Sequence, residues 1–407
     1  MEQKILENYA KLIVRSGLHV QEGQEVIIRA ELDQPEFVSM TVEECYRVGA
    51  KKVTVEWTHQ AITGIHTKYQ STETLGKVEK WEEEKLRHQA EILPCELYLM
   101  SEDPDGLADA DQEKMARARQ MKYPVIKPYK DQMENKQQWC IAAVPGRAWA
   151  KKVFPELPEE ERMEKLWEAI LFASRALEDP MKAWREHDAD LKKRCEYLNS
   201  LGLVQLEYHA GNGTDLRVGL IEDALFLGAN ERTLRGIDFN ANIPSEEVFT
   251  SPKRGEAEGI VFASKPLSYQ GQLIEDFWIR FENGRVSEVH AEKNEALLRK
   301  LIAMDESAAY LGECALVPYR SPISDLGITF YNTLFDENAA CHLALGMGFT
   351  NCIRDYDKYT LEECRAKGVN DSILHEDFMI GTKDLSIIGR TKDGREVEIF
   401  RDGGWAF

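Results

Sequence analysis

The side chains best suited to chemistry are acidic and imidazole groups that stand in apolar segments of the second half of the chain. Residues 375–382 read HEDFMIGT. Residues two apart in a strand share a face, so His375 and Asp377 point the same way and Glu376 points the other. The pair offers two metal ligands from one strand, although a surface histidine beside a hydrogen-bonded aspartate fits the segment too.

A second pair is Glu337 and His342 in ENAACH, which opens a run of Ala, Leu and Gly that predicts a helix. Positions i and i+5 of an ideal helix lie about 140° apart. The two side chains therefore converge only if Glu337 precedes the regular helix. The alternative for this segment is a helix cap followed by a core histidine.

Two further carboxylates stand next to strand-like sequence. Glu313 lies in AAYLGECALVP, which predicts a buried strand, and a buried Glu needs either a metal or an arginine as partner. Glu246 and Glu247 precede the strand-like VFT. Because adjacent strand residues point to opposite sides, at most one of these two faces a common site.

Together these candidates combine carboxylate oxygen and imidazole nitrogen without thiolate, a donor set that suits zinc, manganese, cobalt or magnesium. The excess of carboxylates over histidines favours two ions. A pair of ions about 3.5–4 Å apart activates a water and polarises a carbonyl, so hydrolysis is the expected chemistry. HExxH, GxSxG and CxxC do not occur, so neither a zincin helix nor a serine nucleophile is indicated.

In the first half, strand-like and helical patterns alternate. Strand-like runs occur at 25–30, 51–57, 96–100 and 139–144, with helical spacing at 37–48 between the first two. This β-α-β order predicts a mainly parallel sheet. No GxGxxG or GxxxxGK[ST] accompanies it, so a nucleotide site is not indicated.

The boundary between the halves is expected after a helical, highly charged stretch at 159–200. Beyond it, strand-turn-strand patterns surround Gly211-Asn212-Gly213, Asn283-Gly284 and Asp393-Gly394, and one helix is expected at 293–304. We therefore predict an α/β N-terminal domain with a mainly parallel sheet over residues 1–195. Residues 196–407 are predicted to form an α+β C-terminal catalytic domain rich in antiparallel hairpins.

Composition narrows the possible partners. With 51 Lys and Arg against 71 Asp and Glu, the 407 residues carry a formal net charge of −20, which disfavours nucleic acid and anionic membranes as partners. The eight cysteines are scattered without CxxC, as is typical of a reducing compartment. The first residues lack the pattern of a secretory signal, and no apolar run approaches the ~20 residues of a membrane span. A cytoplasmic protein is expected.

Several segments match a known family. NIPSEEVFTSP, LGECALVPYRSPIS, TFYNTLFDENAACHLALG and HEDFMIGT resemble, in order, signature blocks of the aminopeptidase T / aminopeptidase S metallopeptidases, and GNGTDLRVGL resembles another. The resemblance implies a homodimer that removes N-terminal residues from peptides through a metal-bound hydroxide at a site of two divalent ions, zinc, cobalt or manganese. The metal ligands that it implies are Glu247, Glu313, Glu337, His342, His375 and Asp377. Glu313 is the expected bridging ligand, and Glu313 and Glu337 are the expected catalytic residues.

The chain departs from the family pattern at one position. Members tend to carry a catalytic Tyr seven residues after the histidine of ENAACH, where this chain has Phe349. Losing one hydrogen-bond donor to a tetrahedral intermediate commonly costs ~10²–10³ in rate. Tyr356 and Tyr359 are possible substitutes. The alternative function is therefore a homologue that binds metal and peptide with weak or no catalysis, and a phosphoesterase is a third possibility that the acidic charge disfavours.

Overall fold

The computed structural model describes residues 1–407, and the chain divides into two units. Unit 1 comprises residues 1–187 and 230–245, and unit 2 comprises residues 188–229 and 246–407. The units divide between residues 187 and 188, inside helix α9 (Pro180–Leu201), whereas a single boundary after residue 195 was expected, and residues 230–245 are assigned to unit 1. That segment contains β10 (Asn242–Ile243), which pairs with a strand of unit 1 and is too short to recognise from its sequence.

Unit 1 is centred on a five-stranded sheet in the order β10-β4-β3-β1-β2, in which every pair is parallel, as predicted. Its other strands are β1 (Glu25–Glu31), β2 (Lys52–Thr58), β3 (Cys95–Met100) and β4 (Trp139–Ala143). Its helices are α1 (Gln3–Leu12), α2 (Pro35–Arg47), α3 (Gln60–Tyr69), α4 (Thr72–Leu75), α5 (Lys80–Ile92), α6 (Gln112–Met133), α7 (Arg147–Val153) and α8 (Glu159–Ala173), with a π-helical turn at Ile13–Gly17. A separate two-stranded sheet joins β8 (Glu231–Arg232) and β9 (Asp238–Phe239).

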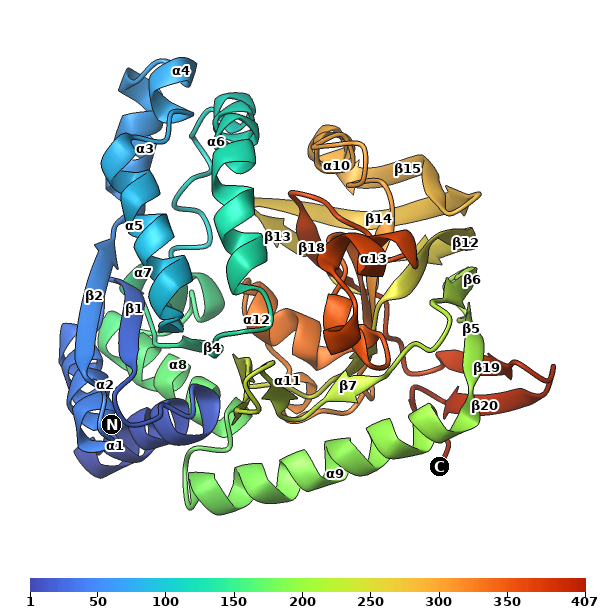
Figure 1. Ribbon diagram of the computed structural model, residues 1–407, viewed down its shortest axis with the longest axis horizontal. Helices are drawn as coiled ribbons and strands as arrows, with labels where there is room; N and C mark the ends of the chain where they lie inside the picture. The colour runs from blue at the N-terminus through green and yellow to red at the C-terminus, as the bar shows by residue number, and fades with distance from the viewer. The chain divides into compact units, whose positions relative to one another are not determined.

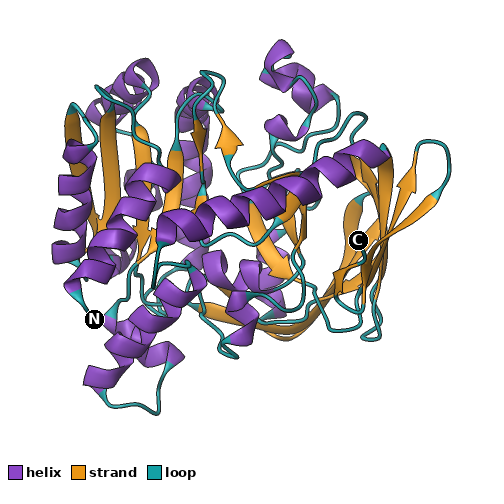
Figure 2. Ribbon diagram, turned by 90° about the horizontal axis from the view of Figure 1, so that it is seen from below, coloured by secondary structure: helices purple, strands orange, loops and turns teal.

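The connections in unit 1 explain how its sheet is covered. Helix α2 leads from β1 to β2, whereas α5 leads from β2 back to β3 on the other side of β1. Right-handed crossovers in opposite directions place their helices on opposite faces, and Figure 2 shows helices on both sides of this sheet. The interior strand β1 is accordingly buried on both faces over Val26, Ile27 and Ile28.

Unit 2 contains two antiparallel sheets. One has the order β18-β17-β16-β11-β7, with β7 (Leu227–Gly228), β11 (Val248–Thr250), β16 (Leu311–Leu316), β17 (His342–Gly346) and β18 (His375–Met379). The larger one has the order β13-β14-β12-β6-β5-β19-β20-β21, with β15 also paired to β14. Its strands are β5 (Leu203–His209), β6 (Asp215–Leu220), β12 (Pro252–Phe262), β13 (Leu267–Tyr269), β14 (Gln272–Glu282), β15 (Arg285–Lys293), β19 (Ser386–Thr391), β20 (Glu396–Arg401) and β21 (Gly404–Trp405).

The three predicted hairpins are confirmed as β5–β6, β14–β15 and β19–β20 (Figure 1). The predicted helix at 293–304 is α10 (Glu295–Leu301), and short helices α11 (Pro322–Asp325), α12 (Thr333–Asp336) and α13 (Leu361–Ala366) lie between the later strands. No helix of the chain is both long and apolar enough to cross a bilayer.

The prediction of a helix in the run that ENAACH opens is wrong. Residues 342–346 form β17, an interior strand of the smaller sheet whose five residues are all buried. A short apolar run fits a buried helix and a buried strand equally, and here the neighbouring strands β16 and β18 decide the outcome. The geometry expected for an i, i+5 helical pair therefore does not apply.

Candidate metal centre

One face of the smaller sheet of unit 2 is apolar. Phe378 of β18 stacks near Phe277 of β14, with ring centroids 5.9 Å apart, and Tyr208 of β5 lies against Cys314 of β16. Both contacts join the smaller sheet to the larger one. Because strand side chains alternate, the residues next to Phe378 and Cys314 must point to the other face, and these include Asp377 and Glu313.

The strand register brings the predicted site residues together on that other face. In the antiparallel pairs Glu313 lies opposite Ala344, and Ala344 lies opposite Asp377, so one row of the sheet reads Glu313, Ala344, Asp377. His342 and His375 are each two residues from a member of this row and therefore share its face. The small Ala344 leaves the space between the two carboxylates open.

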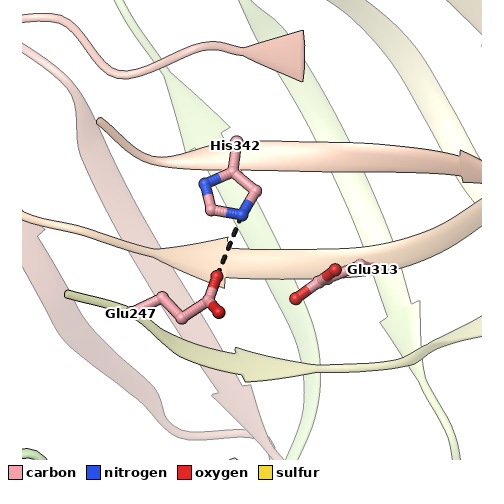
Figure 3. A group of neighbouring side chains, drawn as sticks. All are labelled: Glu247, Glu313 and His342. Atoms are coloured by element: carbon pink, nitrogen blue, oxygen red, sulfur yellow. Dashed lines mark ion pairs between the residues drawn. The ribbon is translucent and has the colours of Figure 1, made fainter. Parts of the chain in front are cut away.

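The side chains converge into two groups that share Glu313. Glu247, Glu313 and His342 offer ligand atoms that all lie within 4.8 Å of one another, and so do Glu313, His375 and Asp377. Nε2 of His342 lies 3.1 Å from Oε2 of Glu247. Figure 3 marks this ion pair with a dashed line. Nε2 of His375 lies 3.3 Å from Glu313 and 3.4 Å from Asp377.

Glu337 lies outside both groups but next to them. It begins the 3₁₀ turn Glu337–Ala339 directly before β17, and it is 9% exposed. Asn338, which is fully buried, donates from Nδ2 to Oε1 of Glu337 at 3.3 Å and accepts at Oδ1 from the backbone N–H of Glu246 at 2.7 Å. Asn338 thereby ties Glu337 to the segment that carries Glu247.

The neighbouring Glu246 belongs to neither group, so only one of the two adjacent glutamates is placed with the other candidate ligands, as strand alternation required. Sequence reasoning did not identify Asn338. The sequence indicates this residue only by its place between Glu337 and the strand of His342. A buried amide at that place needs hydrogen-bond partners for both its oxygen and its nitrogen.

Backbone carbonyls orient both imidazole rings. Nδ1 of His342 lies 3.1 Å from the carbonyl oxygen of Ala340, and Nδ1 of His375 lies 2.8 Å from that of Met347. A carbonyl only accepts, so Nδ1 is the donor in each ring and Nε2 is the nitrogen that faces the carboxylates. This arrangement of a carbonyl, a histidine and a free nitrogen is typical of metal ligands.

The electrostatics of the site call for positive charge. Burial raises the pKa of Glu313 to about 7 despite the hydrogen bond from His375, and burial with repulsion from Asp377 and Glu247 raises the pKa of Glu337 well above its usual range. Burial disfavours the charged form of His342, but the hydrogen bond and charge of Glu247 outweigh it and raise the pKa of His342 to about 10.

The donors fit divalent metal ions. No Lys or Arg pairs with Glu247, Glu313, Glu337 or Asp377 within 4.0 Å, and the ion pairs of Glu247, Glu313 and Asp377 are with histidines. Oδ1 of Asp377 is buried and has no hydrogen-bond partner, although a buried carboxylate oxygen is costly to leave unsatisfied. Carboxylate and imidazole are suitable ligands for zinc, manganese or cobalt.

Comparison with known protein families identifies the family of the chain that carries these residues. The model of the thermophilic metalloprotease (M29) family matches residues 2–405. The chain belongs to this family. It is therefore an enzyme of the hydrolase class, and membership in a metalloprotease family implies divalent metal ions.

Named members of the family are similar over their full length. Aminopeptidase AmpS of Bacillus subtilis (strain 168) is 40% identical over 404 residues, which are 99% of this chain and 98% of that protein. Aminopeptidase T of Thermus thermophilus is 39% identical over 402 residues, 98% of each chain. The solved structure of wild-type AmpT from Thermus thermophilus has a TM-score of 0.89 at 37% identity and covers 100% of both chains. The recognition made from the signature blocks is confirmed.

Phe349 lies beside one of the candidate ligands of this M29 protein. Its ring centroid is 5.1 Å from that of His375 and 5.4 Å from that of Phe249. Its backbone is held by Ser251, whose Oγ accepts from the N–H of Phe349 at 2.7 Å. Tyr356 instead packs against a cluster that contains Ile221 and Ile353, and Tyr359 lies under Lys367.

Proposed function

We propose that this M29 protein is an aminopeptidase that hydrolyses the N-terminal peptide bond of peptides at a site of two divalent metal ions. The observation that carries the proposal is the position of Glu313, which belongs to both ligand groups. A carboxylate has two oxygens, so a single side chain has a ligand for each of two ions. Glu247 and His342 would hold one ion, His375 and Asp377 would hold the other, and Glu313 would be available to both.

When bound, two divalent ions polarise a carbonyl and lower the pKa of a water toward neutrality. The chain itself supplies the negative charge that retains them and holds both imidazole rings in one orientation through the carbonyls of Ala340 and Met347. Glu337 is the carboxylate next to both groups, and we assign to it the transfer of a proton from the attacking water to the leaving amine.

The substrate class follows from charge. A free amino terminus is a cation, and the site contains more carboxylates than histidines within a protein of net charge −20. This field attracts the ammonium group of a peptide and repels phosphoesters. The relatives AmpS and aminopeptidase T are named for activity on amino termini, which supports the same assignment.

The proposal is tested with purified protein and amino-acid anilides, assayed after metal removal and after addition of zinc, cobalt or manganese. We expect turnover only with metal. The absence of metal-dependent turnover on every anilide would count against the proposal.

Two adjacent glutamates provide a matched pair of variants. Glu246 and Glu247 are both 7% exposed, but only Glu247 lies in a ligand group. We expect Glu247→Gln to reduce kcat/KM by more than the ~10–100-fold that outer-shell changes cost at metal sites. Glu246→Gln makes the same chemical change next to it and should retain activity. Equal loss in both variants would assign the effect to folding.

A second candidate function is supported by Phe349, whose ring packs against that of His375 at a position where family members tend to carry a tyrosine. In this function the protein binds metal and peptide but turns peptides over slowly or not at all. Phe349→Tyr distinguishes the two functions. If the native protein is inert and the variant cleaves anilides, the binding function is supported, whereas an active native protein excludes it.

We further propose that the protein works as a homodimer, as the resemblance implies, and in the cytoplasm, as its composition predicts. Sedimentation velocity on the metal-loaded protein tests the first point. A monomer at all concentrations would overturn it. Fractionation of the source cells tests the second.

A further inference from the structure

Asp305 lies in the loop between α10 and β16 and bonds to two separate segments. Within its own loop, Oδ1 accepts from the backbone N–H groups of Ser307 and Ala308, both at 2.8 Å. Across to the segment before β18, Oδ2 accepts from the N–H of Ile373 at 2.6 Å and from Oγ of Ser372 at 2.9 Å. One carboxylate therefore joins the loop that leads to Glu313 with the segment that leads to His375.

A second residue strengthens the same junction. Asn370, which is 1% exposed, donates from Nδ2 to the carbonyl oxygens of Ser307 at 2.8 Å and Gly346 at 2.6 Å. Gly346 ends β17, so three strands are connected here. The fit is close, because a Cβ on Gly346 would lie 2.1 Å from the carbonyl oxygen of Leu374.

The junction continues to a candidate metal ligand through the backbone. Ile373, held by Asp305, is followed by Leu374, whose carbonyl accepts from the N–H of Met347 at 2.6 Å. The carbonyl of Met347 in turn lies 2.8 Å from Nδ1 of His375. A shift of the segment at 372–374 would therefore change both the position of His375 and the acceptor that orients its ring.

We propose that Asp305 is a positioning residue for the metal centre. It acts by holding together the segments that lead to the strands of Glu313 and His375, and it contacts neither of these side chains. This inference rests on the proposed metal function. Glu313 is the shared ligand and His375 belongs to one group only, so their spacing decides whether that group closes around an ion. Residues that orient ligands typically change metal affinity ~10–100-fold when they are altered.

Asp305→Asn is the sharpest variant. The side-chain oxygen of the variant can still accept from the N–H groups of Ser307 and Ala308. Its NH2 group would stand in place of the oxygen that accepts from Ile373, and an NH2 group does not accept a hydrogen bond. The matched control is Asp393→Asn, which changes a loop carboxylate by the same group and the same charge. Asp393 bonds to Arg395 within the turn between β19 and β20, in the other sheet of unit 2.

The measurement is a titration of each metal-free protein with Co²⁺, followed by its visible absorption bands, together with the thermal midpoint of each protein. We expect Asp305→Asn to raise the Co²⁺ dissociation constant ~10-fold or more and to alter the band shape. Asp393→Asn should bind Co²⁺ as the native protein does. Equal affinity in Asp305→Asn and the native protein overturns the inference, even if the variant melts earlier.

If Asp305→Asn does not fold, Ser372→Ala is used, because it removes one donor to Asp305 and leaves the carboxylate in place. It should weaken Co²⁺ binding in the same direction by a smaller factor, and unchanged binding contradicts the proposal. Native protein that binds Co²⁺ but cleaves no anilide would refute the proposed function alone. Native protein that binds no divalent ion would refute both.

Discussion

Both five-stranded sheets contain buried carboxylates, but they are neutralised in different ways. In the parallel sheet of unit 1, Arg29 pairs with Glu96 at 3.0 Å and with Glu56 at 3.2 Å. Nearby in unit 1, Arg15 pairs with the buried Glu44 at 2.5 Å. At the antiparallel sheet of unit 2, four carboxylates lie together without any Lys or Arg partner, and three of them pair with His342 or His375.

We interpret the difference as one between a structural ion pair and a site that binds a ligand. An arginine is part of the chain and is always charged, so the pair in unit 1 is complete when the unit folds. A cluster of acids without such a partner is costly to bury unless a cation from solution joins it. We therefore distinguish a structural ion pair, in which an arginine of the chain supplies the positive charge, from a metal centre, in which a cation from solution supplies it.

The largest expected effect comes from removing metal. Chelation should abolish peptidase activity and lower the thermal midpoint, because a ligand present at 1,000 times its Kd stabilises the native state by about 4.1 kcal/mol. Hydrogen exchange should locate the loss in β16, β17 and β18, with β1 and β3 unchanged. Equal loss of protection in both sheets would contradict the contrast drawn between them.

A pair of Glu→Gln variants should give opposite dependence on metal. Glu96→Gln removes a charged partner of Arg29 and should cost ~1.5–3 kcal/mol of unfolding free energy with or without metal. Glu337→Gln should cost the metal-free protein little, because no Lys or Arg loses its partner, but should reduce the stabilisation that metal provides. Denaturant unfolding of each variant with and without Co²⁺ measures both. If the loss of stability in Glu96→Gln depended on metal, the contrast between the two sheets would be contradicted.

A smaller effect is expected where no charge changes. Ala344 stands between Glu313 and Asp377 in the row across the sheet, and Ala344→Val would place two methyl groups in that space. We expect a loss of metal affinity on the order of tenfold, with an overpacking cost of ~1–3 kcal/mol. A Co²⁺ titration checks this. Unchanged affinity would show that the ions lie away from Ala344.

The two regions also differed in how well their sequences predicted them. The strands β1 to β4 were located within one or two residues, because each is a short β-branched or aromatic run separated by helical spacing. In unit 2 the hairpins were found at their Gly and Asn turns, but β17 was predicted as a helix; in unit 1 the short strand β10 was not recognised. Both are segments whose state is set by partner strands distant in the chain.

For the metal centre, strand alternation predicted that His375 and Asp377 share a face and that only one of the two adjacent glutamates joins the site. The inclusion of Glu337 came from the resemblance, since residue spacing alone left a helix cap as an alternative. Asn338 and the carbonyls of Ala340 and Met347 were not predicted. A backbone carbonyl has no side-chain identity by which sequence could mark it.

Local pattern is enough to say which residues of this chain alternate toward one side of a strand, because the side-chain period of two is a property of the backbone. It is also enough to show that acidic residues stand in segments too apolar for them. Local pattern does not determine which residues of neighbouring strands lie opposite one another, because this register depends on turns, bulges and packing across the whole sheet. Glu313 lies between two ligand groups because β16, β17 and β18 align as they do.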